Sequence, residues 1–513
     1  MRDRCASRRA RPRAGCSSRA TGLCGCGVPD ILAALLEACE RTPDAPAMTL
    51  RRTTLRYRDL RDRILGVASS LTAAGLRPGD RMLFSVRPGL DGICLALGTI
   101  AAGGTVVFAD PGAGEAMFRA RAGLAAPGWV AAESLLYAVS RGPLRRVARA
   151  RGLELPDYRS VVPRARHIYA GPWLPGVPKG AIRLSSLPRH GSPISADPAT
   201  GEALIIFTSG TTAHPKAVVH TRTSLGTGLA DFAAHVGFVS GEVVLTDQLM
   251  VGIPALISGA HWVLPPAGAD PGAKPDRYLP LLDRADVLFA VPAALDALLT
   301  SGVRADLRMV LIGGAPVLRP LLERVRAQLP GTGIRAIYGM TEILPVAIAD
   351  GDEKLAFDGP GDYVGELMGS VAARIDDGEL VVAGDGLASY LGEPPLAELR
   401  TGDLARLEGG RVILGGRSKD MFIRGTTNVY PGLYEPVIAG IPGVREAALV
   451  GVPNDIGDDE LVLAIVGDTS RVRAALPGLI DAAVMPDRIV VLDALPKKGR
   501  SQKLDREALR RLV

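Results

Sequence analysis

The 513-residue chain is poor in several residue types, and each shortage excludes a class of protein. It has six cysteines, and four of them lie within residues 1–26, namely Cys5, Cys16, Cys24 and Cys26. Only Cys39 and Cys94 remain for the rest of the chain. Two cysteines are too few for a disulfide-stabilised extracellular scaffold. This usage is typical of a reducing compartment, so we expect a cytoplasmic protein.

Acidic residues are nearly absent from residues 1–26, which hold seven arginines and only Asp3. The net charge of +6 therefore lies wholly in this segment, and the remainder carries 53 basic and 53 acidic side chains. A nucleic-acid binder would spread positive charge over its fold, so we expect no nucleic-acid partner. The segment lacks the apolar run of a secretory signal. We expect residues 1–27 to be a disordered basic leader, with a transit peptide or a metal-binding cysteine cluster as alternatives.

Long hydrophobic runs are interrupted where they occur. Residues 92–109 and 248–269 are uncharged and long enough to raise the question of a membrane span. Gly103 and Gly104 break the first run, and Pro254, Pro265 and Pro266 interrupt the second. We therefore expect each run to be a buried helix followed by a buried strand, and no membrane span.

The chain contains no internal repeats, but helical and strand-like patterns alternate along most of it. We expect helices at 29–41 and 57–75, and strands at 81–86, 203–207, 287–291, 309–312 and 334–338. Short strands at 379–382 and 411–414 follow. A compact last segment, about 421–513, has strands at 447–452, 461–466 and 488–492. The turn Gly415-Gly416-Arg417 is the expected boundary before this segment.

A Walker A pattern is absent, and no Gly-x-Gly-x-x-Gly motif follows the first strands. The chain has instead a loop of small hydroxyl residues after an expected strand, Phe207-Thr-Ser-Gly-Thr-Thr-Ala-His-Pro-Lys-Ala217. Backbone N–H and hydroxyl groups of such a loop can surround phosphate oxygens, and Lys216 adds a positive charge. Lysines are scarce here, eight against 52 arginines, so a lysine at this place is informative. Alone, such a loop is also typical of an ordinary connection.

Four further strings follow in order along the chain. Gly313-Gly-Ala-Pro316 comes after an apolar strand, where small residues let a flat ring approach the backbone. Tyr338-Gly-Met-Thr-Glu342 follows the next strand and offers an aromatic face, a hydroxyl and a carboxylate. Thr401-Gly-Asp403 supplies an acceptor for sugar hydroxyls, and Gly499–Arg506 places Lys503 in a polar loop. Each string alone fits a turn, a strand end or a solvated charge run, but their order and spacing favour a nucleotide site.

With these strings the sequence resembles the adenylate-forming superfamily of acyl-CoA synthetases, firefly-luciferase-like enzymes and peptide-synthetase adenylation domains. The resemblance covers residues 28–506, and Gly416-Arg-Ser-Lys-Asp-Met-Phe-Ile-Arg-Gly425, continuing to Asn428–Pro431 and Glu435, is similar to the hinge motif of that superfamily. It implies an α/β (mixed α+β) fold with a large N-terminal domain of layered sheets flanked by helices, residues 28–415. It also implies a hinge at 416–420, with Lys419 at the hinge position, and a small mobile C-terminal lid at 421–513.

The resemblance implies a reaction in which a small carboxylic acid attacks the α-phosphate of ATP and pyrophosphate leaves, with Mg²⁺ as cofactor. Two anions must approach, so positioning and charge neutralisation dominate such catalysis. Lys503 would bridge the two anions, and Thr211 and Glu342 would place Mg²⁺. The catalytic set implied is Lys503, Glu342, Lys216 and Arg417. The nucleotide-binding set implied is Thr208, Ser209, Gly210, Thr211, Thr212, Gly314, Ala315, Pro316, Tyr338, Gly339, Thr341 and Asp403.

The sequence departs from the superfamily pattern at several positions. Ala213 and Ala217 replace glycines of the phosphate loop, and an alanine restricts positive φ and adds bulk beside phosphate. Thr426 and Thr427 replace a glycine and an acid of the hinge motif. These changes keep open a different class of function, a catalytically lapsed nucleotide- or acyl-binding module. The segment 246–256 lacks the substrate-gating histidine of many acyl-CoA ligases, and its apolar residues indicate either an apolar acyl group or core packing.

The second half of the reaction has three candidate acceptors. A β-hydroxyl of the substrate would give a β-lactone, and the segments 86–91, 109–114 and 338–346 resemble β-lactone synthetases of bacterial olefin biosynthesis. CoA or a carrier protein would give a thioester instead. We expect a fatty or β-hydroxy acid substrate with lactone closure, and acyl-CoA or carrier-protein ligation as the alternatives.

Overall fold

The computed structural model describes most of the chain. The described residues are 30–111, 115–141, 144–146, 148, 155–188, 201–207, 216–269, 271, 274–417, 420, 422–424, 427–429, 431–453, 459–480, 484–498 and 502–513. The expected leader, the phosphate loop from Thr208 to Pro215 and the hinge residue Lys419 lie outside them.

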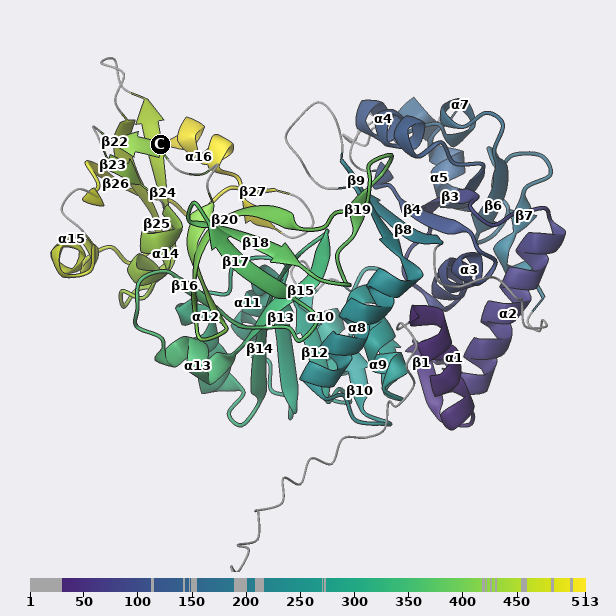
Figure 1. Ribbon diagram of the computed structural model, residues 1–513, viewed down its shortest axis with the longest axis horizontal. Coiled ribbons are helices and arrows are strands. Elements are labelled where there is room, and N and C mark those ends of the chain that lie inside the picture. The colour runs from purple at the N-terminus through teal and green to yellow at the C-terminus, as the bar shows by residue number, and fades with distance from the viewer. Residues whose placement is uncertain are drawn as a thin grey trace, which may run out of the picture.

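The smaller of two large sheets, sheet B, is formed by segments from the first half of the chain together with one short later strand (Figure 1). Its spatial order is β19-β9-β8-β4-β3-β5-β6-β7, and β4, β3, β5, β6, β7 and β8 run parallel. The strands are β3 (Arg81–Ser85), β4 (Thr105–Phe108), β5 (Trp129–Glu133), β6 (Arg166–Ala170), β7 (Ile182–Arg183), β8 (Glu202–Phe207), β9 (Ala217–Thr221) and β19 (Ser389–Tyr390).

The larger sheet, sheet A, has a parallel part and an antiparallel part. The parallel strands are β1 (Pro46–Leu50), β11 (His261–Leu264), β10 (Val243–Leu245), β12 (Val287–Ala290), β13 (Met309–Gly313) and β14 (Gly333–Met340). β2 (Thr53–Arg56) pairs antiparallel with β1 at one edge. Beyond β14 the antiparallel strands are β15 (Ile343–Asp350), β16 (Asp362–Leu367), β21 (Arg411–Arg417), β20 (Leu399–Glu408), β18 (Glu379–Ala383) and β17 (Ala372–Asp376).

Helices lie between the two sheets and on their outer faces. Successive strand residues point to opposite sides of a sheet, so apolar strands present two apolar faces for helices to cover. Met82 and Phe84 of β3 pack into the core between the sheets, whereas Leu83 packs into the core on the outer face of sheet B. The intervening helices are α1 (Ile31–Arg41), α2 (Tyr57–Ala73), α3 (Leu90–Ala101), α8 (Arg222–Val236) and α9 (Leu249–Ile257). Those outside sheet B are α4 (Glu115–Ala125), α5 (Ser134–Val139) and α7 (Tyr158–Val161). Those outside sheet A are α10 (Pro275–Leu282), α11 (Pro292–Thr300), α12 (Arg319–Gln328) and α13 (Gly351–Ala356).

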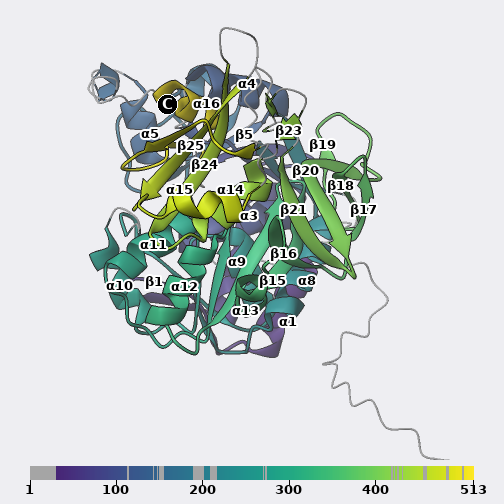
Figure 2. The same cartoon turned by 90° about the vertical axis from the view of Figure 1, so that its left-hand side faces the viewer.

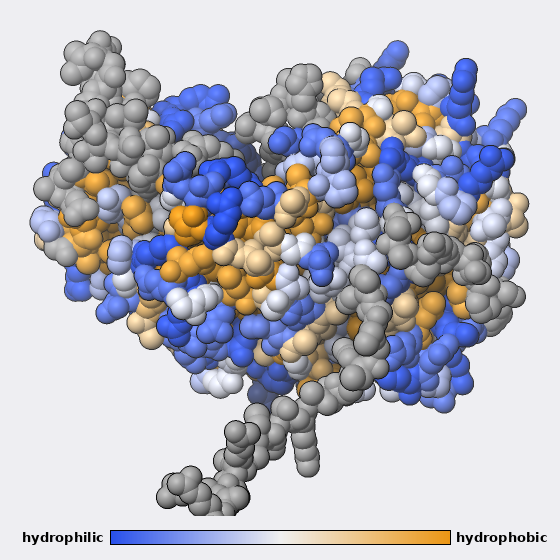
Figure 3. Space-filling view, viewed as in Figure 1, coloured by the Kyte–Doolittle hydropathy of each residue, from blue (hydrophilic) through white to orange (hydrophobic). Residues whose placement is uncertain are grey.

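The two uncharged runs are buried helix–strand pairs, as expected. The first gives α3 and β4 around a turn in which Gly103 has φ +79°, and the second gives α9 and β11. In the described part of the chain, no helix is long and apolar enough to cross a membrane. On the face seen in Figure 3, hydrophilic residues are mixed with hydrophobic ones, and a hydrophobic patch lies over β17 and β18, where Ile375 is exposed.

The C-terminal part forms a small α+β unit with cores of its own (Figure 2). Its three-stranded sheet has the order β24-β25-β26, in which β25 and β26 are parallel. The elements are β22 (Phe422–Arg424), β23 (Thr427–Val429), α14 (Pro431–Ala439), β24 (Val444–Pro453), β25 (Asp459–Gly467), α15 (Val472–Ala475), β26 (Arg488–Val491), β27 (Lys497–Lys498), β28 (Lys503–Leu504) and α16 (Arg506–Leu512). The expected fold class is therefore confirmed: a large N-terminal layered domain is followed by a small C-terminal one.

Three local expectations are wrong. Gly415-Gly416-Arg417 is no turn but the end of β21, where Gly416 pairs with Leu404 and Arg417 with Asp403. Tyr338–Met340 lies within β14 rather than after it, so only Thr341 and Glu342 form the turn to β15. Lys503 begins the short strand β28, which pairs with β27, instead of lying in an irregular loop.

Candidate active site

Gly314–Pro316 and Tyr338 come from neighbouring strands, as the sequence predicts. β13 and β14 are parallel, and Gly313, the last residue of β13, lies opposite Ile337. Gly314 has φ +84°, a left-handed conformation that favours glycine, so the chain can leave the strand sharply there. The backbone of Gly314–Pro316 is thus placed beside the end of β14 that carries Tyr338.

Tyr338 is connected to Asp403 across the sheet. The Tyr338 hydroxyl donates a hydrogen bond of 2.7 Å to Oδ2 of Asp403, whose residue is 3% exposed. Asp403 lies in β20, and its backbone N–H donates to Oγ1 of Thr401 at 3.1 Å. A buried carboxylate needs hydrogen-bond partners, and the tyrosine hydroxyl supplies one. The β20–β21 register places the backbone of Arg417 opposite Asp403.

Thr341 and Glu342, in the turn between β14 and β15, are held by residues of sheet B. Nε2 of His220, on β9, lies 2.7 Å from the Thr341 carbonyl and donates to it. The Tyr390 hydroxyl donates to Oε1 of Glu342 at 3.0 Å, and the Ala388 N–H donates to the Glu342 carbonyl at 2.8 Å. Burial lowers the pKa of His220, so this imidazole is neutral at neutral pH.

Lys216 is exposed and directly precedes β9. Its Nζ lies 4.9 Å from the centre of the Tyr390 ring, within the range of a cation–π contact. Contacts therefore link Lys216 to Glu342 through Tyr390, and a separate hydrogen bond links Tyr338 to Asp403. Glu342 follows Tyr338 by four residues, and we call these five residues the polar edge. The loop residues predicted to hold phosphate, Thr208, Ser209, Gly210, Thr211 and Thr212, lie outside the described residues.

Sequence reasoning missed Tyr390 and His220. β19 has two residues, too few for a strand pattern, and His220 lies among apolar residues of β9. One signal was present, since His220 lies only four residues after Lys216.

The structure also decides two questions about sequence departures. Ala217 begins β9, where it pairs with Phe207 and accepts a hydrogen bond from the Leu391 N–H, so an alanine in this extended strand is unstrained. Ala213 lies outside the described residues. Val251, Ile253, Ala255 and Leu256 of α9 are buried in the cores, so core packing explains the apolar segment 246–256.

Lys503 is exposed on the β27–β28 hairpin, and Arg506 anchors the helix that follows it. Nη1 and Nη2 of Arg506 each donate to Glu435 at 2.8 Å, and Nε lies 3.4 Å from Oδ2 of Asp420. Nη1 also donates to the Leu449 carbonyl at 2.8 Å. We call Arg506, Glu435 and Asp420 the Arg506 clamp. It ties α16 to α14 and to the residue that follows the hinge position.

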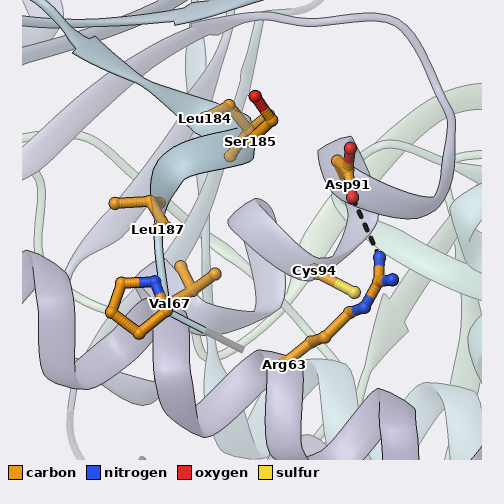
Figure 4. Close-up of a pocket in the computed structure, with 8 residues that line it drawn as sticks. Arg63, Val67, Asp91, Cys94, Leu184, Ser185 and Leu187 are labelled. Carbon is orange, nitrogen blue, oxygen red and sulfur yellow. Dashed lines mark hydrogen bonds and ion pairs between the residues drawn. The ribbon is translucent and has the colours of Figure 1, made fainter. Parts of the chain in front are cut away.

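Two adjoining cavities of about 780 and 50 Å³ lie beside the first turn of α3, between the β1–β2 turn and Leu184. Figure 4 shows the smaller one, where Arg63 of α2 points toward Asp91 of α3 and pairs with it at 3.0 Å. Of the predicted nucleotide-binding residues that the structure describes, none lines either cavity. These cavities are therefore separate from the polar edge.

A protein-family model described as AMP-binding enzyme matches residues 35–390, more than half of the chain. The chain thus belongs to the AMP-binding enzyme family, a class of ATP-dependent adenylate-forming ligases.

Individual relatives agree with this family. The feruloyl-CoA synthase of Amycolatopsis sp is 27% identical over 507 residues, which cover 92% of this chain and 96% of that protein. A CoA ligase of Mycobacterium tuberculosis is 26% identical, with 94% and 98% covered. Among solved structures, the amide bond synthetase of Marinactinospora thermotolerans has a TM-score of 0.77 at 22% identity and covers 94% of this chain and 99% of its own. At that identity the structural likeness confirms the fold alone.

Proposed function

We propose that this enzyme uses ATP to activate a small carboxylic acid as its acyl-adenylate, releasing pyrophosphate. The observation that carries the proposal is the polar edge, in which contacts join Tyr338 to Asp403 and Glu342 through Tyr390 to Lys216. An aromatic face, a buried acceptor, a carboxylate and a cation thereby lie on β14, on the β14–β15 turn and on the segments that contact them. These are the groups that adenine, ribose, Mg²⁺ and phosphate require.

In the proposed reaction the adenine ring lies against Tyr338 and Gly314–Pro316, with Gly339 and Thr341 beside it. The ribose hydroxyls donate to Asp403, near Arg417. Lys216 neutralises the outgoing pyrophosphate together with the loop Thr208–Thr212, and Lys503 neutralises the substrate carboxylate and the α-phosphate as they approach. The protein contributes position and charge, since no group of its own is bonded covalently to the substrate in this scheme.

The described residues fit a magnesium ion brought in by ATP. Mg²⁺ is usually held in such sites by one or two carboxylates, with water and phosphate oxygens completing the octahedron. Glu342 supplies a half-buried carboxylate whose Oε1 is already oriented by Tyr390. We propose that Glu342 and Thr211 hold the ion, which when bound neutralises phosphate charge.

We further propose the division of the chain suggested by the sequence: an N-terminal domain at 28–415, a hinge at 416–420 and a mobile lid at 421–513. Support comes from the separate cores of the C-terminal part and from the position of Lys503 there. Rotation of the lid about Lys419 would bring Lys503 to the polar edge for adenylation and withdraw it for the second step.

For the second step we propose transfer of the acyl group to the thiol of CoA. Support comes from the relatives named as CoA ligases, which match the chain over nearly their whole lengths. Lactone closure by a β-hydroxy fatty acid is the second candidate. It is favoured by residues 86–91 and 109–114, which resemble segments of β-lactone synthetases and begin at the carboxyl ends of β3 and β4. A carrier protein is the third candidate acceptor of the acyl group.

A cytoplasmic location fits the two described cysteines. Cys39 and Cys94 are both free and buried, and burial raises the pKa of each thiol to about 12. Both therefore stay protonated and unreactive, and neither needs an oxidising compartment.

The test is acid-dependent pyrophosphate release from ATP and Mg²⁺, with aromatic, short-chain and long-chain β-hydroxy acids. We expect release with at least one class, and a CoA-dependent thioester from the same acid. A lactone formed without CoA would replace the thioester proposal with the second candidate. If ATP binds but no acid elicits release or exchange, the chain is a lapsed binding module instead.

A further inference from the structure

Tyr390 contacts both charged residues on which the proposed function depends. Its hydroxyl donates to Glu342, and its ring carries the Lys216 ammonium at 4.9 Å from the ring centre. Among the described residues, Lys216 and Glu342 form no ion pair with each other. The neutral Tyr390 side chain thus contacts both the Lys216 ammonium and the Glu342 carboxylate.

The backbone fixes Tyr390 in this place from two directions. β19 pairs antiparallel with β9, so that Tyr390 lies opposite Val218, two residues after Lys216 (Figure 1). The Leu391 N–H donates to the Ala217 carbonyl at 2.9 Å, and the Ala388 N–H donates to the Glu342 carbonyl at 2.8 Å. Ala388 and Leu391, on either side of Tyr390, therefore join the β14–β15 turn to the strand after the expected phosphate loop.

We propose that Tyr390 is a positioning residue of the active site, which keeps Glu342 oriented for Mg²⁺ and keeps Lys216 from pairing with it before ATP binds. This inference rests on the proposed function, which assigns those two roles. A direct ion pair between Lys216 and Glu342 would have to break each time Mg²⁺ and phosphate entered. The phenol holds the two charges with weaker, neutral contacts, so that both are preorganised for the ligand.

Tyr363 provides a matched control, because it has the same two contacts away from the polar edge. Its hydroxyl donates to Oε2 of Glu353 at 2.9 Å, and the Arg411 guanidinium lies 5.6 Å from its ring centre. Tyr363 belongs to β16 and packs into the core on the outer face of sheet A. A purely structural effect of removing a hydroxyl should therefore be seen equally in Tyr363→Phe.

The experiment titrates Mg²⁺ at fixed ATP and measures ATP binding by calorimetry, with pyrophosphate release as a second readout. Tyr390→Phe removes the hydrogen bond to Glu342 but keeps the ring under Lys216. We expect the Mg²⁺ concentration for half-maximal ATP binding to rise about tenfold, because the free energy of a hydrogen bond to a charged group corresponds to about this factor. The affinity for ATP at saturating Mg²⁺ should be nearly unchanged. Tyr390→Leu removes both contacts and should also weaken ATP binding at saturating Mg²⁺.

The control Tyr363→Phe should leave both quantities at wild-type values. A Tyr390→Phe protein with wild-type melting temperature and wild-type Mg²⁺ dependence would overturn the proposal, as would an equal shift in Tyr363→Phe. If Tyr390→Leu does not fold, Tyr390→Phe alone decides. Failure of the proposed function is distinguishable, because calorimetric binding of ATP and Mg²⁺ does not require any acid to react.

Discussion

The polar edge and the Arg506 clamp organise charge in opposite ways. In the clamp, Arg506 makes two hydrogen bonds to Glu435 and a further contact with Asp420, and all these groups are mostly buried. Burial acts to lower the pKa of Arg506, but Glu435 and Asp420 outweigh it, so the pKa lies above its usual value. At the polar edge, by contrast, Lys216 and Glu342 each contact a neutral tyrosine.

The difference matches the role proposed for each group. A structural charge is stable when protein partners neutralise it, because an unpaired buried charge is costly. A charge that has to meet phosphate or a metal ion would lose part of that interaction if it first had to leave a partner. We therefore expect substitutions in the clamp to affect stability and substitutions at the polar edge to affect ligand binding and rate.

The largest effect is expected for Arg506→Met, which leaves Glu435 and Asp420 without their main partner. Removing one member of a buried ion pair costs about 3–5 kcal/mol, and the C-terminal unit should lose about this much unfolding free energy. The measurement is denaturant unfolding followed by a probe in that unit. The double variant Arg506→Met with Glu435→Leu should recover part of the loss, because it also removes the unpaired carboxylate. Equal unfolding midpoints for wild type and Arg506→Met would contradict the role of the clamp.

Lys503→Ala should have the next largest effect, and we expect it to lower the rate of adenylation without changing stability. A charge-assisted contact made in the transition state contributes about 10²-fold, so pyrophosphate release should fall by about that factor. Because Lys503 is exposed, the melting temperature should stay at the wild-type value. Lys498→Ala on the same hairpin is the matched control, since Lys498 lies opposite Lys503 and pairs with Asp505 at 3.4 Å. If Lys503→Ala adenylates normally, or if Lys498→Ala is equally slow, the catalytic assignment is wrong.

A smaller effect is expected for Asp403→Asn, which keeps the shape of the side chain but removes its charge. The ribose hydroxyls would lose a charged acceptor, and KM for ATP should rise about tenfold. Steady-state kinetics at varied ATP measure this change. Glu379→Gln offers a comparison on the neighbouring strand, because Glu379 accepts from the Gly402 N–H yet has no proposed ligand. A wild-type KM in Asp403→Asn would exclude ribose binding at this carboxylate.

The sequence was sufficient for those parts of the fold that local patterns determine. Strands such as β12 and β13 are continuous apolar runs because both faces of the sheet are covered by helices or other buried layers. The order of motifs likewise predicts Tyr338, Glu342 and Asp403 as residues of one nucleotide site. The hydrogen bond between Tyr338 and Asp403 then confirmed that two of these motifs meet in space.

What could not be predicted depends on pairing between distant segments. β19 has only two residues, and its place next to β9 is decided by sheet pairing rather than by its own pattern. Glycines near residue 415 indicated a turn, but pairing with β20 extends β21 through Arg417. Tyr390 and His220 were missed for the same reason, since their contacts with the β14–β15 turn are made by segments distant from it in the sequence.

The smallest predicted effect concerns pH and His220. Because burial lowers its pKa below the usual 6.5, the unfolded chain binds a proton more readily than the folded protein. Stability is therefore unaffected above about pH 6.5 and falls on acidification, by at most about 1.4 kcal/mol per pH unit for this group.

Melting temperatures of wild type and His220→Leu between pH 7.5 and pH 5 measure the contribution of His220. His220→Leu should be less stable at pH 7.5, because the Thr341 carbonyl loses its 2.7 Å donor, but its melting temperature should fall less steeply with acid. The two curves should therefore converge as the pH is lowered. Parallel curves would mean that His220 is protonated equally in both states, and that the neutral imidazole is not what holds Thr341 and Glu342 in place.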